Sequence, residues 1–276
     1  MYIVFVSKLI EIILVDDGSN DNSGKLCDKL SETDGRIKVV HQKNAGVAGA
    51  RRTGFNLSTG GVITFVDSDD YIELDMYEIM LKKMDETNSD IVFCDYNSVT
   101  KEKTDKRYFL KEDKILTKFE TLKYLANDEI KSFMCNKLYK RKILKESDFY
   151  VGKLMEDYLC MTDIFNRCNT VSYVHGTFYN YVRRDSSIMG NKSNMFKYWE
   201  GCKFRLDWYE KNYPEYISLC LNRAVRVALT CFENKNLNLE QKYVVKKFLK
   251  ENDIEILKNT KLNIHKKLKV LYFLYF

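Results

Sequence analysis

The chain has 276 residues, of which 45% are hydrophobic and 30% charged, a balance that excludes a disordered chain and predicts a globular protein with a buried core. The net charge of +6 is modest, and most of the chain mixes both signs without a basic stripe, which excludes nucleic acid as a partner. The eight cysteines form no CxxC pair, which favours free thiols over disulfides or a zinc site. Because no signal peptide and no apolar run of about 20 residues is present, we expect a cytoplasmic protein or one peripheral on the inner face of the cell membrane.

The first 95 residues alternate between strand and helix patterns. Short apolar runs rich in β-branched residues predict buried strands at 11–15, 37–40, 62–66 and 91–94. Helical patterns lie between them, one carrying Leu26 and Leu30, one over 46–58 and one that follows Asp75. This alternation predicts a doubly wound, mostly parallel α/β sheet.

Beyond residue 95 the pattern changes. Residues 96–114 are polar and strand-like, and further helices are predicted at 117–125, 136–145 and 156–168, followed by strands near 171–174 and 178–182. From about residue 194 the chain is helical, with a break at Pro214. We therefore expect three parts: a nucleotide-binding half over 1–95, an acceptor-binding and catalytic half over 96–195, and a helical appendage over 196–276.

Two carboxylates follow the first predicted strand, in the sequence VDDGS at residues 15–19. Ligands of open α/β sheets bind at the carboxyl ends of the strands, where Asp16 and Asp17 can accept hydrogen bonds from a base or a ribose. The alternative is that both residues only shape the turn and cap the next helix, because Asp, Gly and Ser are common there. This motif alone does not separate the two interpretations.

A second acidic motif, FVDSDD at residues 65–70, follows the third predicted strand. Three carboxylates in four positions repel one another unless a cation lies among them, and Mg²⁺ or Mn²⁺ held by one or two carboxylates and substrate phosphates is the natural solution. Such an ion also neutralises the charge that develops on a pyrophosphate leaving group. The alternative is a solvated acidic turn before the next helix.

Between these motifs lies the small-residue segment NAGVAGARRTG at residues 44–54. Its small side chains permit close approach of helix, sheet and ligand, and Arg51 can reach a phosphate or a base. The alternative for this segment is a tightly packed helix with two surface arginines.

Taken in order, the patterns VDDGSxDxS, NxGxxxARxxG and FVDSDD resemble the family 2 glycosyltransferases of the GT-A fold. The resemblance is strong over residues 11–95 and looser to about residue 190. It implies that Asp16 and Asp17 hold the nucleotide base and that Arg51 lies near the base and phosphates. It also implies that Asp67 contacts the ribose and that Asp69 binds the Mg²⁺ or Mn²⁺ ion.

Two later segments extend the resemblance. The sequence MEDY at residues 155–158 resembles the Glu-Asp pair of the family, which implies that Asp157 is the base that deprotonates the acceptor in an inverting displacement. The alternative is that Glu156 and Asp157 only cap a helix. The sequence YNYVRRDSSI at residues 179–188 resembles a segment that implies a place for Arg184 over the pyrophosphate, with Val182 where an arginine is common. The segment CNKLYK at residues 135–140 has Cys135 where the family commonly has tryptophan.

The start of the chain departs from the family pattern. Only ten residues precede Glu11, whereas the family begins with a further strand and helix. Residues 2–6 are apolar, but a parallel crossover needs about a dozen residues, so they cannot complete such a unit. We therefore expect a sheet that lacks its first strand–helix unit, as in a truncated gene product, and weak donor binding.

The C-terminal segment 262–276 joins lysines to an apolar, aromatic end. As a helix it places Ile264, Leu268, Leu271 and Tyr275 on one face, which suits contact with an anionic membrane. Packing of this helix on its neighbours is an equal alternative.

The sequence thus predicts an inverting glycosyltransferase that moves a sugar from a nucleotide diphosphate, with a UDP-sugar favoured, to a glycan or lipid-linked acceptor in bacterial surface-polysaccharide synthesis. The first alternative is a non-catalytic remnant of such an enzyme. A metal-dependent nucleotidyltransferase is a further hypothesis, because acidic strand ends serve that class as well.

Overall fold

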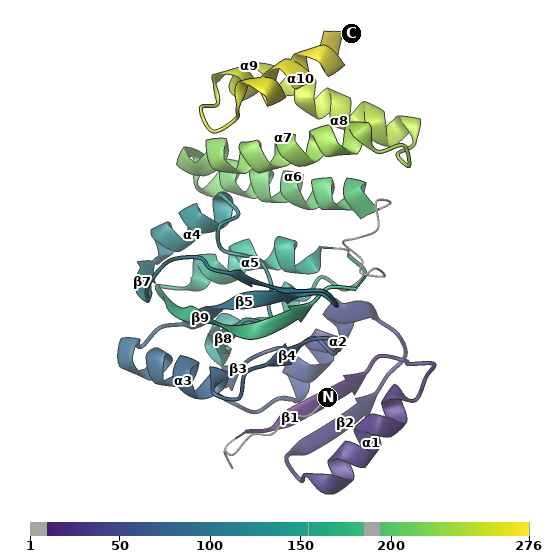
Figure 1. Cartoon of the computed structure of the whole chain (residues 1–276), viewed down its shortest axis with the longest axis vertical. Coiled ribbons are helices and arrows are strands. Elements are labelled where there is room, and N and C mark those ends of the chain that lie inside the picture. The colour runs from purple at the N-terminus through teal and green to yellow at the C-terminus, as the bar shows by residue number, and fades with distance from the viewer. Residues whose placement is uncertain (1–9, 154, 185–193, 276) are drawn as a thin grey trace. The chain divides into compact units, whose positions relative to one another are not determined.

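The computed structural model describes residues 10–153, 155–184 and 194–275 (Figure 1). The chain divides into two compact units, the first formed by Met1–Lys118 with Phe133–Val182 and the second by Phe119–Ser132 with Arg183–Phe276. The predicted missing strand–helix unit concerns residues 1–9, which lie outside the described residues. The functional division at residues 95 and 195 stays a prediction.

A parallel strand pair opens the first unit. Strand β1 (Ile12–Asp16) pairs in register with β2 (Ile37–His41), so that Asp16 lies opposite His41 at the carboxyl ends of both strands. Helix α1 (Ser23–Thr33) makes the crossover between them, and α2 (Gly46–Leu57) follows β2 and packs on β1. These four elements confirm the strands and helices predicted for the first 58 residues.

The other strands of the first unit form a seven-stranded sheet. Its strand order is β3-β8-β5-β9-β4, with β6 on β5 and β7 on β9. The bounds are β3 Val62–Ile63, β4 Tyr71–Ile72, β5 Ile91–Val99, β6 Thr104–Arg107, β7 Lys114–Thr117, β8 Lys137–Lys140 and β9 Thr170–Val182. The central strand β5 has both faces covered, since the side chains of residues 91–95 are all buried, as its continuous apolar run predicts.

Two helices of the first unit, α3 and α5, connect to strands of this sheet, and α3 packs on it through apolar residues at helical spacing. Helix α3 (Met76–Thr87) places Met76, Met80 and Met84 on one face, where they pack with Val92 and Cys94 of the sheet. The spacing of four residues brings these three methionines to one side of the helix. Helix α5 (Glu156–Arg167) leads directly into β9, as predicted.

The larger sheet is mixed, so the expectation of a mostly parallel sheet is wrong for it. Among the described strands of the larger sheet, β5 and β9 form a parallel pair, whereas β3–β8, β5–β8, β4–β9, β5–β6 and β7–β9 are antiparallel. Of these antiparallel pairs, β5–β6 is joined by a short connection, which returns the chain antiparallel. The partners in the other four pairs lie dozens of residues apart in the sequence, so the path of the whole chain sets their direction. The α/β class itself is confirmed.

The predicted helix at residues 136–145 is also wrong. This segment forms β8, followed by a single 3₁₀ turn at Arg141–Ile143. Strand β8 lies between β3 and β5, and Lys137, Leu138 and Tyr139 are buried there. The hydrogen bonds of two neighbouring strands outweigh a weak helical pattern.

The two strands predicted near 171–174 and 178–182 merge into one long strand, β9. Its register against β5 shifts beside Asp95, where the chain passes through Gly176. This glycine has a φ of 142°, and a Cβ atom there would lie 2.5 Å from the Phe178 ring. A residue other than glycine would therefore be strained at this irregularity and would displace the Phe178 ring.

The second unit is helical, which confirms the predicted C-terminal helical region. Helices α6 and α7 pack together, and the break between them falls at Pro214, as predicted. Helices α8, α9 and α10 each contact α7. Their bounds, with that of α4, are α4 Lys118–Ala126, α6 Met195–Asn212, α7 Ile217–Glu233, α8 Leu239–Glu251, α9 Asp253–Lys258 and α10 Ile264–Tyr275. Across the described ranges, every helix is too short or too polar to span a bilayer.

Candidate active site

The first group of predicted site residues lies where β1 and β2 end. Asp17 Oδ1 accepts hydrogen bonds from the Ala45 backbone N–H at 2.8 Å and from Gln42 Nε2 at 2.7 Å. The turn that presents Asp17 requires Gly18, whose φ is 75° and whose Cβ would lie 2.9 Å from the Asn44 backbone nitrogen. Asp17 thus fixes the start of α2, as the turn-and-cap interpretation predicts. Its second oxygen makes no hydrogen bond within the described residues and remains available to a ligand.

Asp16 is held more completely than Asp17. Its Oδ1 accepts the Ser19 backbone N–H at 3.0 Å, and its Oδ2 lies 2.8 Å from Nδ1 of His41. Hydrogen bonds from the Ser19 side chain and from His41 lower the pKa of Asp16 to about 2. Both oxygens of Asp16 therefore serve the local structure, and Asp17 is the better placed of the two acids to contact a nucleotide.

His41 connects the first acidic turn to α1. Its Nε2 lies 3.0 Å from Asp28 Oδ1, while Nδ1 bonds Asp16. Because an ionised carboxylate only accepts hydrogen bonds, this arrangement favours the imidazolium form, in which both ring nitrogens donate. The contacts with Asp16 and then Asp28 raise the pKa of His41 above its ordinary value of 6.5.

We expect this ion pair to give a measurable pH dependence of folding. Because the pKa of His41 is raised in the folded state, its stabilisation is complete below pH 6.5 and is lost as the pH rises through the folded-state pKa. The difference in unfolding free energy between the native chain and His41→Gln should therefore be largest at about pH 6 and shrink toward about pH 9. Urea unfolding across this range measures it. His265→Gln, at an exposed site on α10, is the control, and a His41→Gln difference that is constant or grows with pH contradicts the assignment.

The second group forms around Arg51, on α2. Its Nη2 donates to Asp67 Oδ1 at 2.7 Å and its Nη1 to Glu156 Oε1 at 2.9 Å. The side chain of Arg51 is only 11% exposed, and that of Glu156 only 13%. Although burial opposes the charged guanidinium, the neighbouring carboxylates raise the pKa of Arg51 further. One arginine thus joins the FVDSDD turn to the Glu-Asp pair, two motifs that are far apart in the sequence.

Asp70 is a structural member of the FVDSDD turn. It is buried, its Oδ2 accepts the Tyr179 hydroxyl at 2.6 Å, and its Oδ1 accepts the Val182 backbone N–H at 2.8 Å. Burial raises the pKa of Asp70 to about 6 in spite of these two bonds. The Tyr179 hydroxyl also accepts the Asp67 backbone N–H at 3.3 Å. Tyr179, on β9, therefore fixes both ends of the acidic turn.

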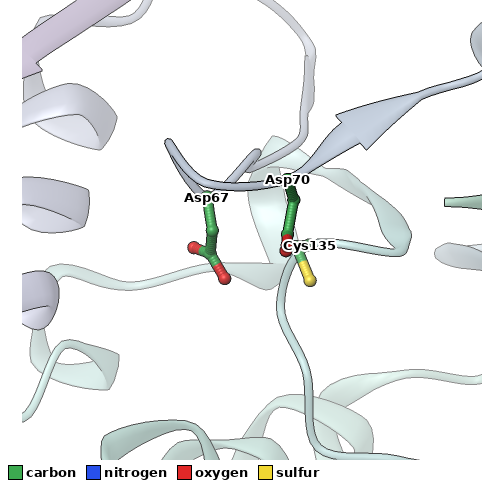
Figure 2. Close-up of side chains that lie close together, drawn as sticks. All are labelled: Asp67, Asp70 and Cys135. Atoms are coloured by element: carbon green, nitrogen blue, oxygen red, sulfur yellow. The ribbon is translucent and has the colours of Figure 1, made fainter. Parts of the chain in front are cut away.

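Asp67, Asp70 and Cys135 bring ligand atoms within 4.8 Å of one another (Figure 2). Both oxygens of Asp70 are already engaged, and burial keeps the pKa of the Cys135 thiol well above its usual range, so that the thiol stays protonated. A protonated thiol is a poor ligand for a hard cation. We therefore attribute this cluster to packing of the turn.

The residues that suit Mg²⁺ or Mn²⁺ are Asp67 and Asp69. Asp69 is exposed and makes no hydrogen bond or ion pair within the described part of the chain. Asp67 bonds Arg51 through Oδ1, and its Oδ2 makes no hydrogen bond to the described residues. Carboxylate oxygens on partly or fully exposed side chains match the preference of these ions, which bind one or two carboxylates together with phosphate and water oxygens. The donor set thus fits the ion that the resemblance implies.

Asp157 lies in the first turn of α5, beside Glu156. Its Oδ1 accepts the Tyr158 backbone N–H at 2.7 Å, and its negative charge acts on Arg51. Met155, directly before the helix, has a φ of 63°, a left-handed conformation that costs of order 1–3 kcal/mol for a residue other than glycine. Such strain is typical of functional sites, and the positive end of α5 favours an ionised Asp157.

Arg184 belongs to the second unit and is exposed. Its predicted place over the pyrophosphate therefore stays a prediction. Residues 179–182 of the same segment belong to the first unit, where the Tyr179 hydroxyl donates a hydrogen bond to Asp70.

Sequence reasoning missed two residues of this site. His41 gives no local signal, because its two carboxylate partners lie 25 and 13 residues away in the sequence. Tyr179 enters the sequence analysis only as part of a segment that resembles the family. A tyrosine on a buried strand needs a hydrogen-bond partner, but the sequence does not show that this partner is Asp70.

The fold and this arrangement define a class of protein. The structure is similar to the crystal structure of residues 1–349 of TarS from S. aureus in complex with UDP-GlcNAc, with a TM-score of 0.69 and 20% sequence identity, covering 91% of this chain and 73% of that one. At this identity the similarity shows the fold alone. It confirms the GT-A type fold.

The sequence shows the family. The model of glycosyl transferase family 2 matches residues 6–148, so the chain belongs to that family. It is 36% identical over 190 residues to the glycosyltransferase GlyA of Streptococcus pneumoniae serotype 4, and 30% identical over 190 residues to GlyG of the same organism. The matches cover 66% and 65% of this chain, but 27% of GlyA and 63% of GlyG.

Proposed function

We propose that this chain transfers a sugar from a nucleotide diphosphate donor to a glycan or lipid-linked acceptor in surface-glycan synthesis, with inversion at the anomeric carbon. The observation that carries the proposal is the double ion pair of Arg51, which holds the acidic turn of Asp67 next to the helix that bears Asp157. A donor-binding motif and a candidate base are thereby fixed to one residue. The structurally similar TarS was crystallised in complex with UDP-GlcNAc, which supports a UDP-sugar as the donor for this chain.

Asp157 is the proposed catalytic base. It removes the proton from the acceptor hydroxyl while that oxygen attacks the anomeric carbon and the nucleotide diphosphate leaves. Inversion follows because the attack is a single displacement from the face opposite the leaving group. Glu156 does not take this role, because its Oε1 is bonded to the guanidinium of Arg51.

The remaining residues are proposed to bind the donor. Asp17, with Asp16 beside it, accepts hydrogen bonds from the base, Asp67 contacts the ribose, and Arg184 pairs with the pyrophosphate. Asp69 and Asp67 would hold Mg²⁺ or Mn²⁺, which neutralises the pyrophosphate as it departs. Residues 1–95 would thus serve the nucleotide and 96–195 the acceptor, with 196–276 as an appendage. We propose that this takes place on the cytoplasmic side, at the inner face of the cell membrane.

Replacing the proposed metal ligand tests this function. Asp69→Ala is expected to lower the Mn²⁺-dependent hydrolysis of UDP-sugars by about 100-fold, because an ion that supplies several kcal/mol of charge stabilisation is lost. Its unfolding free energy should change by less than about 0.5 kcal/mol, since Asp69 is exposed. Release of UDP from a panel of UDP-sugars, with and without Mn²⁺, is the measurement.

Asp85→Ala, at an exposed acid on α3, is the matched control and should keep full activity. Hydrolysis that is absent from the native chain, while Mn²⁺-dependent UDP binding persists, supports the non-catalytic alternative. Release of pyrophosphate from a nucleoside triphosphate in place of UDP from a UDP-sugar favours the nucleotidyltransferase.

A further inference from the structure

Helix α10 presents an apolar stripe to solvent. Ile264, Leu268, Tyr272 and Tyr275 are 61%, 56%, 61% and 63% exposed, and their spacing of four, four and three residues puts them on one face. Val270, on the other side of the helix, is fully buried, and α10 contacts α7, α8 and α9. The helix is therefore anchored in its unit by one side while the opposite side carries large apolar groups into water. Leu271, which the sequence places on the apolar face, is only partly exposed.

Positive charge is concentrated in the C-terminal part of the chain that carries this stripe. Residues 240–276 contain nine lysines and four acids, and therefore account for nearly all of the net charge of +6 of the whole chain. Lys267 and Lys269 flank the stripe on α10 itself, and the exposed Lys258 and Lys261 precede the helix. Lys269 is paired with Glu233 and Lys258 with Glu255, and Lys267 donates to the Leu257 carbonyl but keeps its charge without an acidic partner among the described residues. The excess charge therefore comes mainly from the other lysines.

This combination selects the partner. A second copy of the chain would bring two lysine-rich faces together, and like charges in an interface oppose association. A bilayer that contains anionic lipid neutralises the lysines and takes up the apolar side chains at the same time. Tyrosines suit this depth, because the ring is apolar and the hydroxyl reaches the polar headgroups.

We propose that the exposed face of α10, formed by Ile264, Leu268, Tyr272 and Tyr275, docks on an anionic lipid bilayer with the helix lying in the plane of the interface. An amphipathic helix of this kind buries its apolar face at the boundary between headgroups and acyl chains. The docking does not depend on sugar transfer. Only its purpose rests on the proposed function, since docking brings the protein to lipid-linked acceptors.

Flotation of the whole chain with vesicles tests the proposal. We expect the native chain to float with vesicles that contain about one-third phosphatidylglycerol, to remain behind with pure phosphatidylcholine, and to be released by about 0.5 M NaCl. The double variant Ile264→Gln with Leu268→Gln should bind at least about 10-fold more weakly. The matched control replaces two exposed apolar residues of the first unit, Leu74→Gln with Ile115→Gln, and should float like the native chain.

Other outcomes overturn the proposal. Flotation of the double variant at the native level shows that the stripe is not the contact, and absence of flotation of the native chain removes the docking altogether. If sedimentation shows a native dimer that the double variant dissociates, without any lipid binding, the stripe is an interface between copies. Circular dichroism verifies that the variants fold. Retained Mn²⁺-dependent UDP binding by a chain that does not float separates failure of the docking from failure of the proposed function.

Discussion

Arg51→Met is expected to lower the free energy of unfolding by about 3 kcal/mol. Removing one member of a buried ion pair leaves its partners uncompensated, at a cost of about 3–5 kcal/mol, and the lower end applies because Asp67 is 30% exposed. Glu156, at 13% exposure, would be left beside Asp157 with no cation between it and the acidic turn. Urea unfolding, followed by circular dichroism, gives the value.

Arg52→Met is the matched control, one residue along the same helix. Arg52 makes no hydrogen bond or ion pair within the described ranges, and its replacement should change stability by less than about 0.5 kcal/mol. Arg51→Lys should recover only part of the loss, because an ammonium group lacks the planar fork that reaches two carboxylates. Equal stabilities of Arg51→Met and Arg52→Met would show that the double ion pair does not hold the site together.

Asp157→Asn is expected to lower kcat for sugar transfer by about 100- to 10,000-fold, the usual contribution of a general base. The amide has the size of the carboxylate but cannot accept a proton, so the affinity for UDP in the presence of Mn²⁺ should stay within about 3-fold. Turnover with the best donor and acceptor found, together with calorimetry of UDP binding, separates the two effects.

Glu156→Gln distinguishes chemistry from structure at the same helix end. It removes the charge that pairs with Arg51, so it should lower stability more than Asp157→Asn does, while Asp157→Asn should have the larger effect on kcat. Asp163→Asn, further along α5, is the control for a lost charge on this helix and should retain full turnover. If Asp157→Asn keeps native turnover, Asp157 only caps the helix.

The positions of the two acidic turns could be predicted from the local sequence pattern. Both VDDGS and FVDSDD follow apolar strands, and the chemistry of such turns depends on residue types that are adjacent in the sequence. The pattern could not rank the acids within a turn, because hydrogen bonds to distant residues decide their availability. Asp16 and Asp70 have both oxygens engaged, whereas Asp69 and one oxygen each of Asp17 and Asp67 remain accessible.

Strand β8 shows where local pattern is insufficient. Its four residues carry no clear strand signal, and they adopt the extended form because β3 and β5 supply hydrogen bonds on both edges. Strand β8 is antiparallel to both neighbours, so it contributes to the mixed character of the larger sheet. Strand pairing between segments that are dozens of residues apart is a property of the whole chain, and no short window of sequence contains it.

The sequence by itself determined the α/β class, the family, and the residue types of the donor motifs, since these follow from periodicity and from motifs of a few residues. Only the tertiary structure decided that Arg51 joins Asp67 to Glu156, that Tyr179 fixes the acidic turn, and which face of α10 remains exposed. Periodicity gives the apolar face of a helix or strand, but the partner of a side chain depends on which segments pack together, and that is settled by the fold as a whole.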